Sequence, residues 1–268
     1  MNVTVLGSGS RGNALLLSAA TGTVLVDAGF PLATLARRAA SAGAPLHDLD
    51  ALILTHEHAD HARGAAAVAK AVGCPVYASG GTHRALAHPL ADADVRMLAT
   101  TERNDIGTVL IDAVRTGHDA AEPVALRVTD PASGATVGIA YDVGRFTPRL
   151  ARLLRAADCL VLEANHDDQL LRTGPYPASV RSRIAGPTGH LSNWQASQIA
   201  AELWHEDLYT VVLVHLSERC NRPELAREAV LAALTARGFH GRVLVASQDR
   251  PLPPIPVRRG QLVLDLFD

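Results

Sequence analysis

The sequence is poor in cysteine, lysine and aromatic residues. Its three cysteines, Cys74, Cys159 and Cys220, are far apart and form no CxxC pair, which argues against a disulfide framework and a cysteine-ligated zinc site. Lys70 is the only lysine among 25 basic residues, and the formal net charge is −2. Because the chain lacks an excess of positive charge, any nucleic-acid site would have to be local.

Long apolar runs are also missing. No stretch approaches the roughly 18 apolar residues of a membrane span, and the start MNVTVLGSGS lacks the features of a signal peptide. The expected location is therefore cytoplasmic, with no membrane partner. A homodimer is the general expectation for such a protein, although no motif supports it.

The chain instead contains a regular series of short apolar strands and amphipathic helices. With 268 residues, 48% of them hydrophobic, it can bury a large core. Predicted strands cover residues 2–6, 14–17, 23–27, 51–55, 75–78, 107–114, 123–129, 135–141, 159–164, 211–215 and 242–246, and predicted helices cover 31–42, 61–72, 147–156, 178–185, 192–204 and 223–237. This order predicts two stacked sheets covered by helices. We expect one domain over residues 1–268, with a Pro-rich C-terminal tail at 250–268.

The segment Gly7–Gly12 matches the pattern GxGxxG directly after a predicted strand. In a dinucleotide site this motif opens a helix, whereas the residues after Gly12 predict two strands joined by a turn. We therefore interpret the segment as a loop at the rim of a site. Ser8, Ser10 and Asn13 are its candidate substrate contacts.

The strongest chemical signal is HEHADH at 56–61, where an apolar strand ends and a helix begins. In an extended segment alternate side chains share a face, so His56 and His58 can bind one ion together. The turn into the helix directs Asp60 and His61 toward a second position. Imidazole and carboxylate ligands without thiolate favour a hydrolytic pair of zinc or manganese ions, with iron as a further candidate, over a structural zinc site.

HEHADH resembles the HxHxDH motif of metallo-β-lactamase-fold hydrolases, and LVDAG, TGHDAAEP, YDVG and VVLVHLS occur in the order of that family. The resemblance implies an αββα sandwich, in which two mixed β-sheets are flanked by helices. Asp27 is implied to brace the ligand loop through hydrogen bonds. The implied ligands of one ion are His56, His58, His118 and Asp142, and those of the other are Asp60, His61, Asp142 and His215.

Two neighbouring divalent ions can bind a bridging water, lower its pKa and stabilise charge on the attacking and leaving oxygens. A departing alkoxide also benefits from a proton donor, and His190 is our candidate. Resemblance to tRNA 3′-processing endonucleases and related phosphodiesterases implies that Glu163 orients His190, and we count Asp60 with these two as catalytic. His166 has three open interpretations: an outer residue that supports a metal ligand, a substrate contact, or a solvated loop histidine.

Further segments narrow the resemblance to the single-domain YycJ-like (WalJ-like) group: EANHD at 163–167, GPYP at 174–177 and GHLSN at 189–193. This resemblance covers about residues 1–250. It implies a phosphodiesterase or nuclease, with 5′-to-3′ exonuclease action on DNA as the usual proposal and single-stranded DNA or a small nucleotide as substrate. Cys220 stands where the group has an asparagine. The candidate substrate and phosphate contacts in these loops are Asn193, Arg11, Arg181, Arg183, Arg219 and Arg222.

Two other functions stay open. A thiolester hydrolase of the glyoxalase II type uses the same ligands on the same scaffold, but such enzymes tend to carry a THTPGH-like third motif, and Glu163 and His190 have no obvious use with a thiolate leaving group. A non-catalytic metal-binding module would be expected to have lost ligands, whereas all seven are present here. β-Lactam hydrolysis is disfavoured by His61 and by the absence of a motif cysteine.

Overall fold

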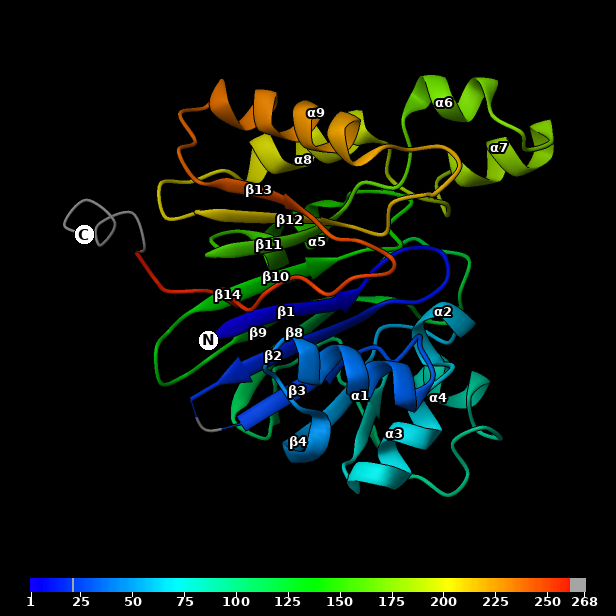
Figure 1. The fold of residues 1–268 in the computed structure, drawn as a ribbon, viewed down its shortest axis with the longest axis vertical. Helices are drawn as coiled ribbons and strands as arrows, with labels where there is room; N and C mark the ends of the chain where they lie inside the picture. The colour runs from blue at the N-terminus through cyan, green and yellow to red at the C-terminus, as the bar shows by residue number, and fades with distance from the viewer. Residues whose placement is uncertain (21, 261–268) are drawn as a thin grey trace.

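The computed structural model describes residues 1–20 and 22–260, which form two seven-stranded sheets stacked face to face (Figure 1). The first sheet contains, in spatial order, β14 (Ile255–Pro256), β1 (Asn2–Gly7), β2 (Ala14–Ala19), β3 (Gly22–Val26), β4 (Leu49–Leu54), β5 (Val76–Ala78) and β6 (Val95–Met97). The second contains β13 (Arg242–Val245), β12 (Thr210–Val214), β11 (Cys159–Glu163), β10 (Thr136–Ala140), β9 (Val124–Thr129), β8 (Val109–Arg115) and β7 (Asn104–Ile106). Both sheets are mixed, with antiparallel pairs at β1–β3 and β7–β10 and parallel pairs at β3–β6 and β10–β13.

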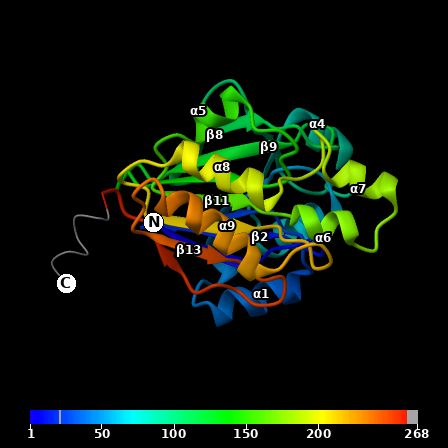
Figure 2. The same cartoon turned by 90° about the horizontal axis from the view of Figure 1, so that it is seen from above.

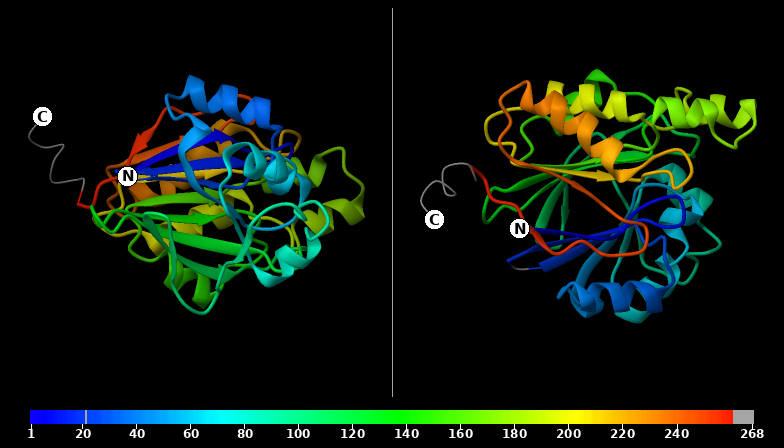
Figure 3. Two further views of the ribbon diagram at one scale, coloured as in Figure 1. Left: turned by 90° about the horizontal axis from the view of Figure 1, so that it is seen from below. Right: turned by 45° about the horizontal axis from the view of Figure 1, so that its top comes forward.

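Helices cover the outer faces of both sheets. On the side of the first sheet lie α1 (Leu32–Ser41), α2 (Ala59–Ala62), α3 (Ala65–Val72) and α4 (Gly80–Ala85), as the view from below shows (Figure 3). On the side of the second lie α5 (Pro148–Leu154), α6 (Asp168–Thr173), α7 (Ala178–Ile184), α8 (Asn193–Leu203) and α9 (Pro223–Thr235), with α8 and α9 crossing above the strands (Figure 2). The predicted αββα sandwich is therefore confirmed.

The layers follow from the alternation of side chains along each strand. In β2, Leu15 and Leu17 belong to the core between the two sheets, whereas Leu16 packs in the core shared with α1 and α3. In β11, Val161 faces the inter-sheet core and Leu162 packs in the core shared with α5, α8 and α9. Because both faces of these strands are buried, their sequences are nearly continuous apolar runs.

Two predicted segments differ from the structure. The helix predicted at 61–72 is divided into α2 and α3 at Gly64, whose N–H donates to the Ala28 carbonyl and where a Cβ would lie 2.1 Å from the Phe30 carbonyl oxygen. Part of the expected Pro-rich tail belongs to the core, because β14 pairs with β1 and Ile255 and Val257 are buried. Residues 261–268 of that tail lie outside the described residues.

Several short elements had no expectation attached to them: β6, β7, β14, α4 and α6. Ser79 and Asp167 cap the N-termini of α4 and α6 by accepting hydrogen bonds from backbone N–H groups. All three cysteines are free and buried. Over residues 1–20 and 22–260, no helix combines the length and apolarity needed to cross a membrane.

Candidate metal centre

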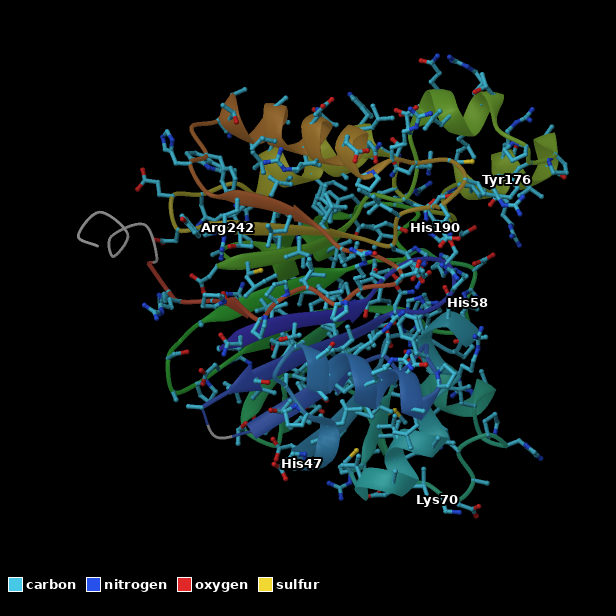
Figure 4. The ribbon with its side chains drawn as sticks, in the orientation of Figure 1. His47, His58, Lys70, Tyr176, His190 and Arg242 are labelled. Carbon is cyan, nitrogen blue, oxygen red and sulfur yellow. The ribbon has the colours of Figure 1, made fainter. Side chains whose placement is uncertain are left out.

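The predicted ligands converge because most of them directly follow strands whose ends meet at one end of the sandwich. His56 follows β4, His118 follows β8, Asp142 follows β10 and His215 follows β12. Figure 4 shows His58 and His190 at this end of the sheets and Arg242 at the opposite end. The topology thus brings together residues that are up to 159 positions apart, from His56 to His215.

Three residues of the centre have a left-handed backbone conformation. The φ angles are 59° at Asp27, 54° at Asp142 and 56° at His215. This conformation costs a non-glycine residue about 1–2 kcal/mol and is enriched at functional sites. Hydrogen bonds hold two of them in place: the Asp27 N–H donates to the Ile53 carbonyl, and the His215 N–H donates to Oγ of Ser8 at 2.8 Å.

The ligand atoms form two groups that share Asp142. One group is His56, His58 and His118, and the other is Asp60, His61 and His215; in each, the ligand atoms lie within 4.8 Å of one another. Oδ2 of Asp142 is 2.9 Å from Nε2 of His61 and 4.0 Å from Nε2 of His56. Oδ1 of Asp142 is 3.7 Å from Nε2 of His118 and 3.4 Å from Nδ1 of His215. Asp142 therefore occupies the position between the two groups that the resemblance implies.

His56 tests whether these residues suit a metal ion. Its Nε2 is buried and has no hydrogen-bond partner among the described residues. Burial, with the neighbouring histidine His61, holds the pKa of His56 well below its ordinary value, so the ring is in the neutral form that coordinates metals. An unpartnered buried nitrogen is costly in a protein, and divalent cations bind to imidazole and carboxylate. The buried His/Asp groups are consistent with a binuclear metal site.

Asp27 lies behind the second group and orients His61. Its carboxylate accepts hydrogen bonds from the N–H and hydroxyl of Thr55, both at 2.8 Å, and from the hydroxyl of Tyr141 at 2.7 Å. Oδ2 of Asp27 also lies 2.8 Å from Nδ1 of His61, so Nε2 is the nitrogen that faces Asp142. Burial lowers the pKa of His61, but the carboxylates of Asp142 and Asp27 outweigh it and raise that pKa well above its ordinary value. Tyr141 was not predicted; its place before Asp142 in YDVG is the signal that could have indicated it.

The structure also brings Glu163 and His190 together. Glu163 is buried, accepts hydrogen bonds from the N–H groups of Val143 (2.9 Å) and Leu191 (3.1 Å), and places Oε1 2.7 Å from Nδ1 of His190. Burial opposes charge on His190, but Glu163 and Asp142 outweigh it and raise the pKa of His190 to about 10. Burial likewise raises the pKa of Glu163, but His190 outweighs it and the net pKa is about 2. The pair is therefore ionic at neutral pH, with a proton on each imidazole nitrogen.

The centre opens into a cavity of about 330 Å³. Its walls include the expected ligands His58, Asp60, His118, Asp142 and His215, together with His190 and Ser10. A larger cavity of about 850 Å³ lies beside α5 on β8 and β9, and none of the predicted ligands or catalytic residues lines it. Chemistry rather than size therefore identifies the candidate site.

Two of the expected substrate contacts in the glycine-rich loop lie beneath the site instead of on its rim. Oγ of Ser8 donates to Oδ1 of Asn13 at 2.8 Å and accepts from the N–H of His215. Nδ2 of Asn13 lies 3.1 Å from Nε2 of His61. Both residues are buried and bonded within the chain, so they support the ligand residues, and the expectation of a substrate contact is corrected. Ser10, which is exposed and lines the cavity, keeps that prediction.

Asn193 is also turned away from substrate. It forms a buried reciprocal amide pair with Asn221, at 2.8 and 2.9 Å, and Asn221 also donates to the Ala164 carbonyl at 2.8 Å. The expected substrate contact of Asn193 is therefore corrected to a bond between the first residue of α8 and the loop before α9. His166 is 1% exposed, and its Nδ1 has no partner among the described residues. This excludes the solvated-loop interpretation and leaves the other two for His166 open.

The five candidate phosphate contacts differ in position. Arg183 lines the cavity, with a side chain that is 69% exposed. Arg11 forms two ion pairs, with its Nη2 2.6 Å from Oε1 of Glu218 and 3.1 Å from Oδ1 of Asp249. The other three do not line the cavity: Arg181, Arg219 and Arg222.

Comparisons with known proteins agree with this geometry. The model of the Beta-lactamase superfamily domain matches residues 22–216, which contain all seven predicted ligands. The chain is 30% identical to exodeoxyribonuclease YycJ of Bacillus anthracis over 242 residues, covering 89% of this chain and 91% of the relative. It is 29% identical to exodeoxyribonuclease WalJ of Streptococcus pneumoniae over 235 residues, covering 86% and 87%. The crystal structure of the metallo-beta-lactamase fold protein YhfI from Bacillus subtilis superposes with a TM-score of 0.71 at 21% identity, covering 94% of this chain and 98% of that one. The chain therefore belongs to the metallo-β-lactamase superfamily.

Proposed function

We propose that the protein is a binuclear metal-dependent phosphodiesterase that acts as a 5′-to-3′ exonuclease on DNA. The observation that carries the proposal is the Glu163–His190 pair, 2.7 Å apart, beside the ligand groups. His190 lines the same cavity as the expected ligands. The names of the two relatives, both exodeoxyribonucleases at about 30% identity over most of the chain, support the choice of DNA as substrate.

The chain's own residues supply the proton chemistry. Two divalent cations held by the two ligand groups and Asp142 would lower the pKa of a bound water and neutralise charge on a phosphate. His190 is held protonated by Glu163, with Nδ1 directed at the carboxylate. Its Nε2–H is then the group that can protonate the leaving alkoxide. Asp60, whose pKa lies below its ordinary range because His215 and His61 outweigh the effect of burial, stays ionised beside the reacting phosphate.

The same pair distinguishes this proposal from thiolester hydrolysis. A thiolate leaves readily without a proton, whereas an alkoxide of high pKa needs one. A buried carboxylate that keeps an imidazole protonated therefore favours an oxygen leaving group. A non-catalytic metal-binding module would have no use for this pair.

The test is the release of nucleotides from single-stranded DNA labelled at either the 5′ or the 3′ end. Wild-type protein is assayed in manganese, in zinc and after chelation, beside the Asp142→Ala variant as a blank. We expect metal-dependent and Asp142-dependent hydrolysis, with immediate release of the 5′ label as a mononucleotide and progressive shortening of the 3′-labelled strand. No product above the blank, from protein shown to carry two metals, would overturn the proposal, and a thiolester would then be the next substrate to assay.

A further inference from the structure

Helix α7 is unusual among the helices of residues 1–20 and 22–260, because none of its residues is buried. Every other helix in this range has at least one buried residue. Figure 2 shows α7 projecting from the end of the molecule, and Figure 4 places Tyr176 at the end that carries His58 and His190. The helix therefore contributes little to the core, and its position needs another explanation.

Apolar side chains of α7 and of the residues just before it face the cavity that the expected metal ligands line. Tyr176, Val180 and Ile184 all line it. Val180 and Ile184 are four residues apart in α7 and so share one face of the helix, and Tyr176 precedes them at the same spacing. All three are half-buried. The cavity is thus polar on the side of the expected metal ligands, whereas the α7 side adds these apolar side chains next to the charged Arg183. This combination suits a substrate that has a charged group next to a flat apolar one.

Tyr176, Val180 and Ile184 together form an apolar wall of the cavity. The C-terminal end of this wall, at Ile184, is bonded to the segment that carries His190. The N–H of His190 donates to the Ile184 carbonyl at 2.8 Å. At Gly189 a Cβ would lie 2.2 Å from the carbonyl oxygens of Arg183 and Ile184, so only glycine allows this close approach. The distance between the wall and the proposed proton donor is therefore set by backbone contacts.

The Tyr176 end of the wall is held by two arginines. The guanidinium of Arg181 donates to the Tyr176 carbonyl at 2.8 Å. The guanidinium carbon of Arg219 lies 5.9 Å from the centre of the Tyr176 ring, within the range of a cation–π contact. Arg219 covers one face of the ring, and an aromatic ring held in this way can stack on a nucleobase with its opposite face.

We propose that Tyr176, with Val180 and Ile184, forms a subsite that stacks the nucleobase next to the phosphate to be cleaved. The inference rests on the proposed function and adds to it that the enzyme selects phosphodiesters bearing a nucleoside. The base has to be unstacked from its neighbours, as at the end of a single strand. Stacking depends on the π-face that every base has, so the subsite accepts all four bases.

The experiment compares two substrates that share a p-nitrophenyl leaving group. One is thymidine 5′-(p-nitrophenyl phosphate), and the other is methyl p-nitrophenyl phosphate, which lacks the nucleoside. Both are assayed with wild-type protein and the Tyr176→Ala and Tyr176→Phe variants. The control is Tyr77→Ala, because Tyr77 makes the same contact with Arg96, also at 5.9 Å, and does not line the cavity.

We expect Tyr176→Ala to raise KM for the thymidine ester about 10-fold, as the loss of one stacked base would, and to leave kcat and the methyl ester unchanged. Tyr176→Phe and Tyr77→Ala should both behave as wild type. An equal effect of Tyr176→Ala on both esters, or no effect on either, would overturn the subsite while leaving the phosphodiesterase intact. Failure of the metal-loaded wild type to hydrolyse either ester would instead overturn the proposed function, and the subsite with it.

Discussion

Oε1 of Glu163 lies 2.7 Å from Nδ1 of His190. The same oxygen is 3.2 Å from Nδ1 of His215, so one buried carboxylate contacts both the proposed proton donor and an expected metal ligand. Because Glu163 occupies the Nδ1 side of His190, Nε2 is the nitrogen left for substrate. The positions of the donor and of the second ligand group are therefore set together.

Replacing His190 should affect substrates according to their leaving group. For His190→Ala we expect kcat on DNA to fall about 10²- to 10⁴-fold, the usual contribution of a general acid, and kcat on a p-nitrophenyl ester to fall much less, because that leaving group needs no proton. His47→Ala is the control, since His47 is 69% exposed and lies away from the site (Figure 4). Equal losses on both substrates would contradict the role of His190.

The ionic pair should make the stability of metal-free protein depend on pH. The pKa of His190 is raised from 6.5 to about 10. The contribution of protonated His190 to the free energy of unfolding is therefore complete below pH 6.5 and is lost as the pH rises through 10. The pKa of Glu163 is lowered from 4.5 to about 2. The contribution of ionised Glu163 to the free energy of unfolding is therefore present above pH 4.5 and is lost as the pH falls through 2. Urea unfolding should therefore show the largest difference between wild type and Glu163→Gln between about pH 4.5 and 6.5. A difference that does not shrink toward pH 10 would refute the pairing.

Metal content should report the two ligand groups separately. Wild type should hold two ions per chain, and His118→Ala should lose one, because His118 belongs to one group only. Asp142→Ala should lose both, because its oxygens face both groups. Mass spectrometry of dialysed protein gives the stoichiometry, and the exposed His240 offers the control His240→Ala. One ion in the wild type would rule out a binuclear centre.

Asp27 should affect metal affinity without touching the metal. Asp27→Asn weakens the bond that orients His61, and loss of such a supporting group typically costs about 10- to 100-fold in affinity. Tyr141→Phe removes only one hydrogen bond to Asp27, worth about 1 kcal/mol, so its effect should be smaller. Competition against a chromophoric chelator measures both affinities. If the two variants bind metal as tightly as wild type, Asp27 does not orient the ligand.

Ala156 lies outside the site and also has a positive φ, of 58°. A glycine adopts this conformation without the cost of about 1–2 kcal/mol that a Cβ imposes, so Ala156→Gly should increase the free energy of unfolding by about 1 kcal/mol. Ala232 is exposed and lies within α9, and Ala232→Gly should decrease the free energy of unfolding by about 0.5–1 kcal/mol. Urea titration of both variants checks the sign. A destabilised Ala156→Gly would show that the left-handed conformation is not strained.

The sequence by itself determined most of the strands and the expected ligands. Apolar runs such as Leu15–Leu17 can be recognised because both faces of each strand are buried. HEHADH supplies four expected ligands within six residues. His118, Asp142 and His215 are isolated residues after predicted strands, and the resemblance to the family identified them as expected ligands. These features depend on local patterns, which a single sequence contains.

Only the tertiary structure decided which way the loop side chains point. The glycine-rich loop predicted substrate contacts at Ser8 and Asn13, yet Ser8 bonds to His215, 207 positions away. Asn193, at the start of α8, bonds to Asn221 in the loop before α9. The sequence also did not predict the left-handed φ angles at Asp27, Asp142 and His215. Nor did it predict the apolar wall that contains Tyr176. The physical reason is that the direction of a loop side chain depends on backbone strain and on contacts with residues distant in sequence, and neither leaves a periodic pattern.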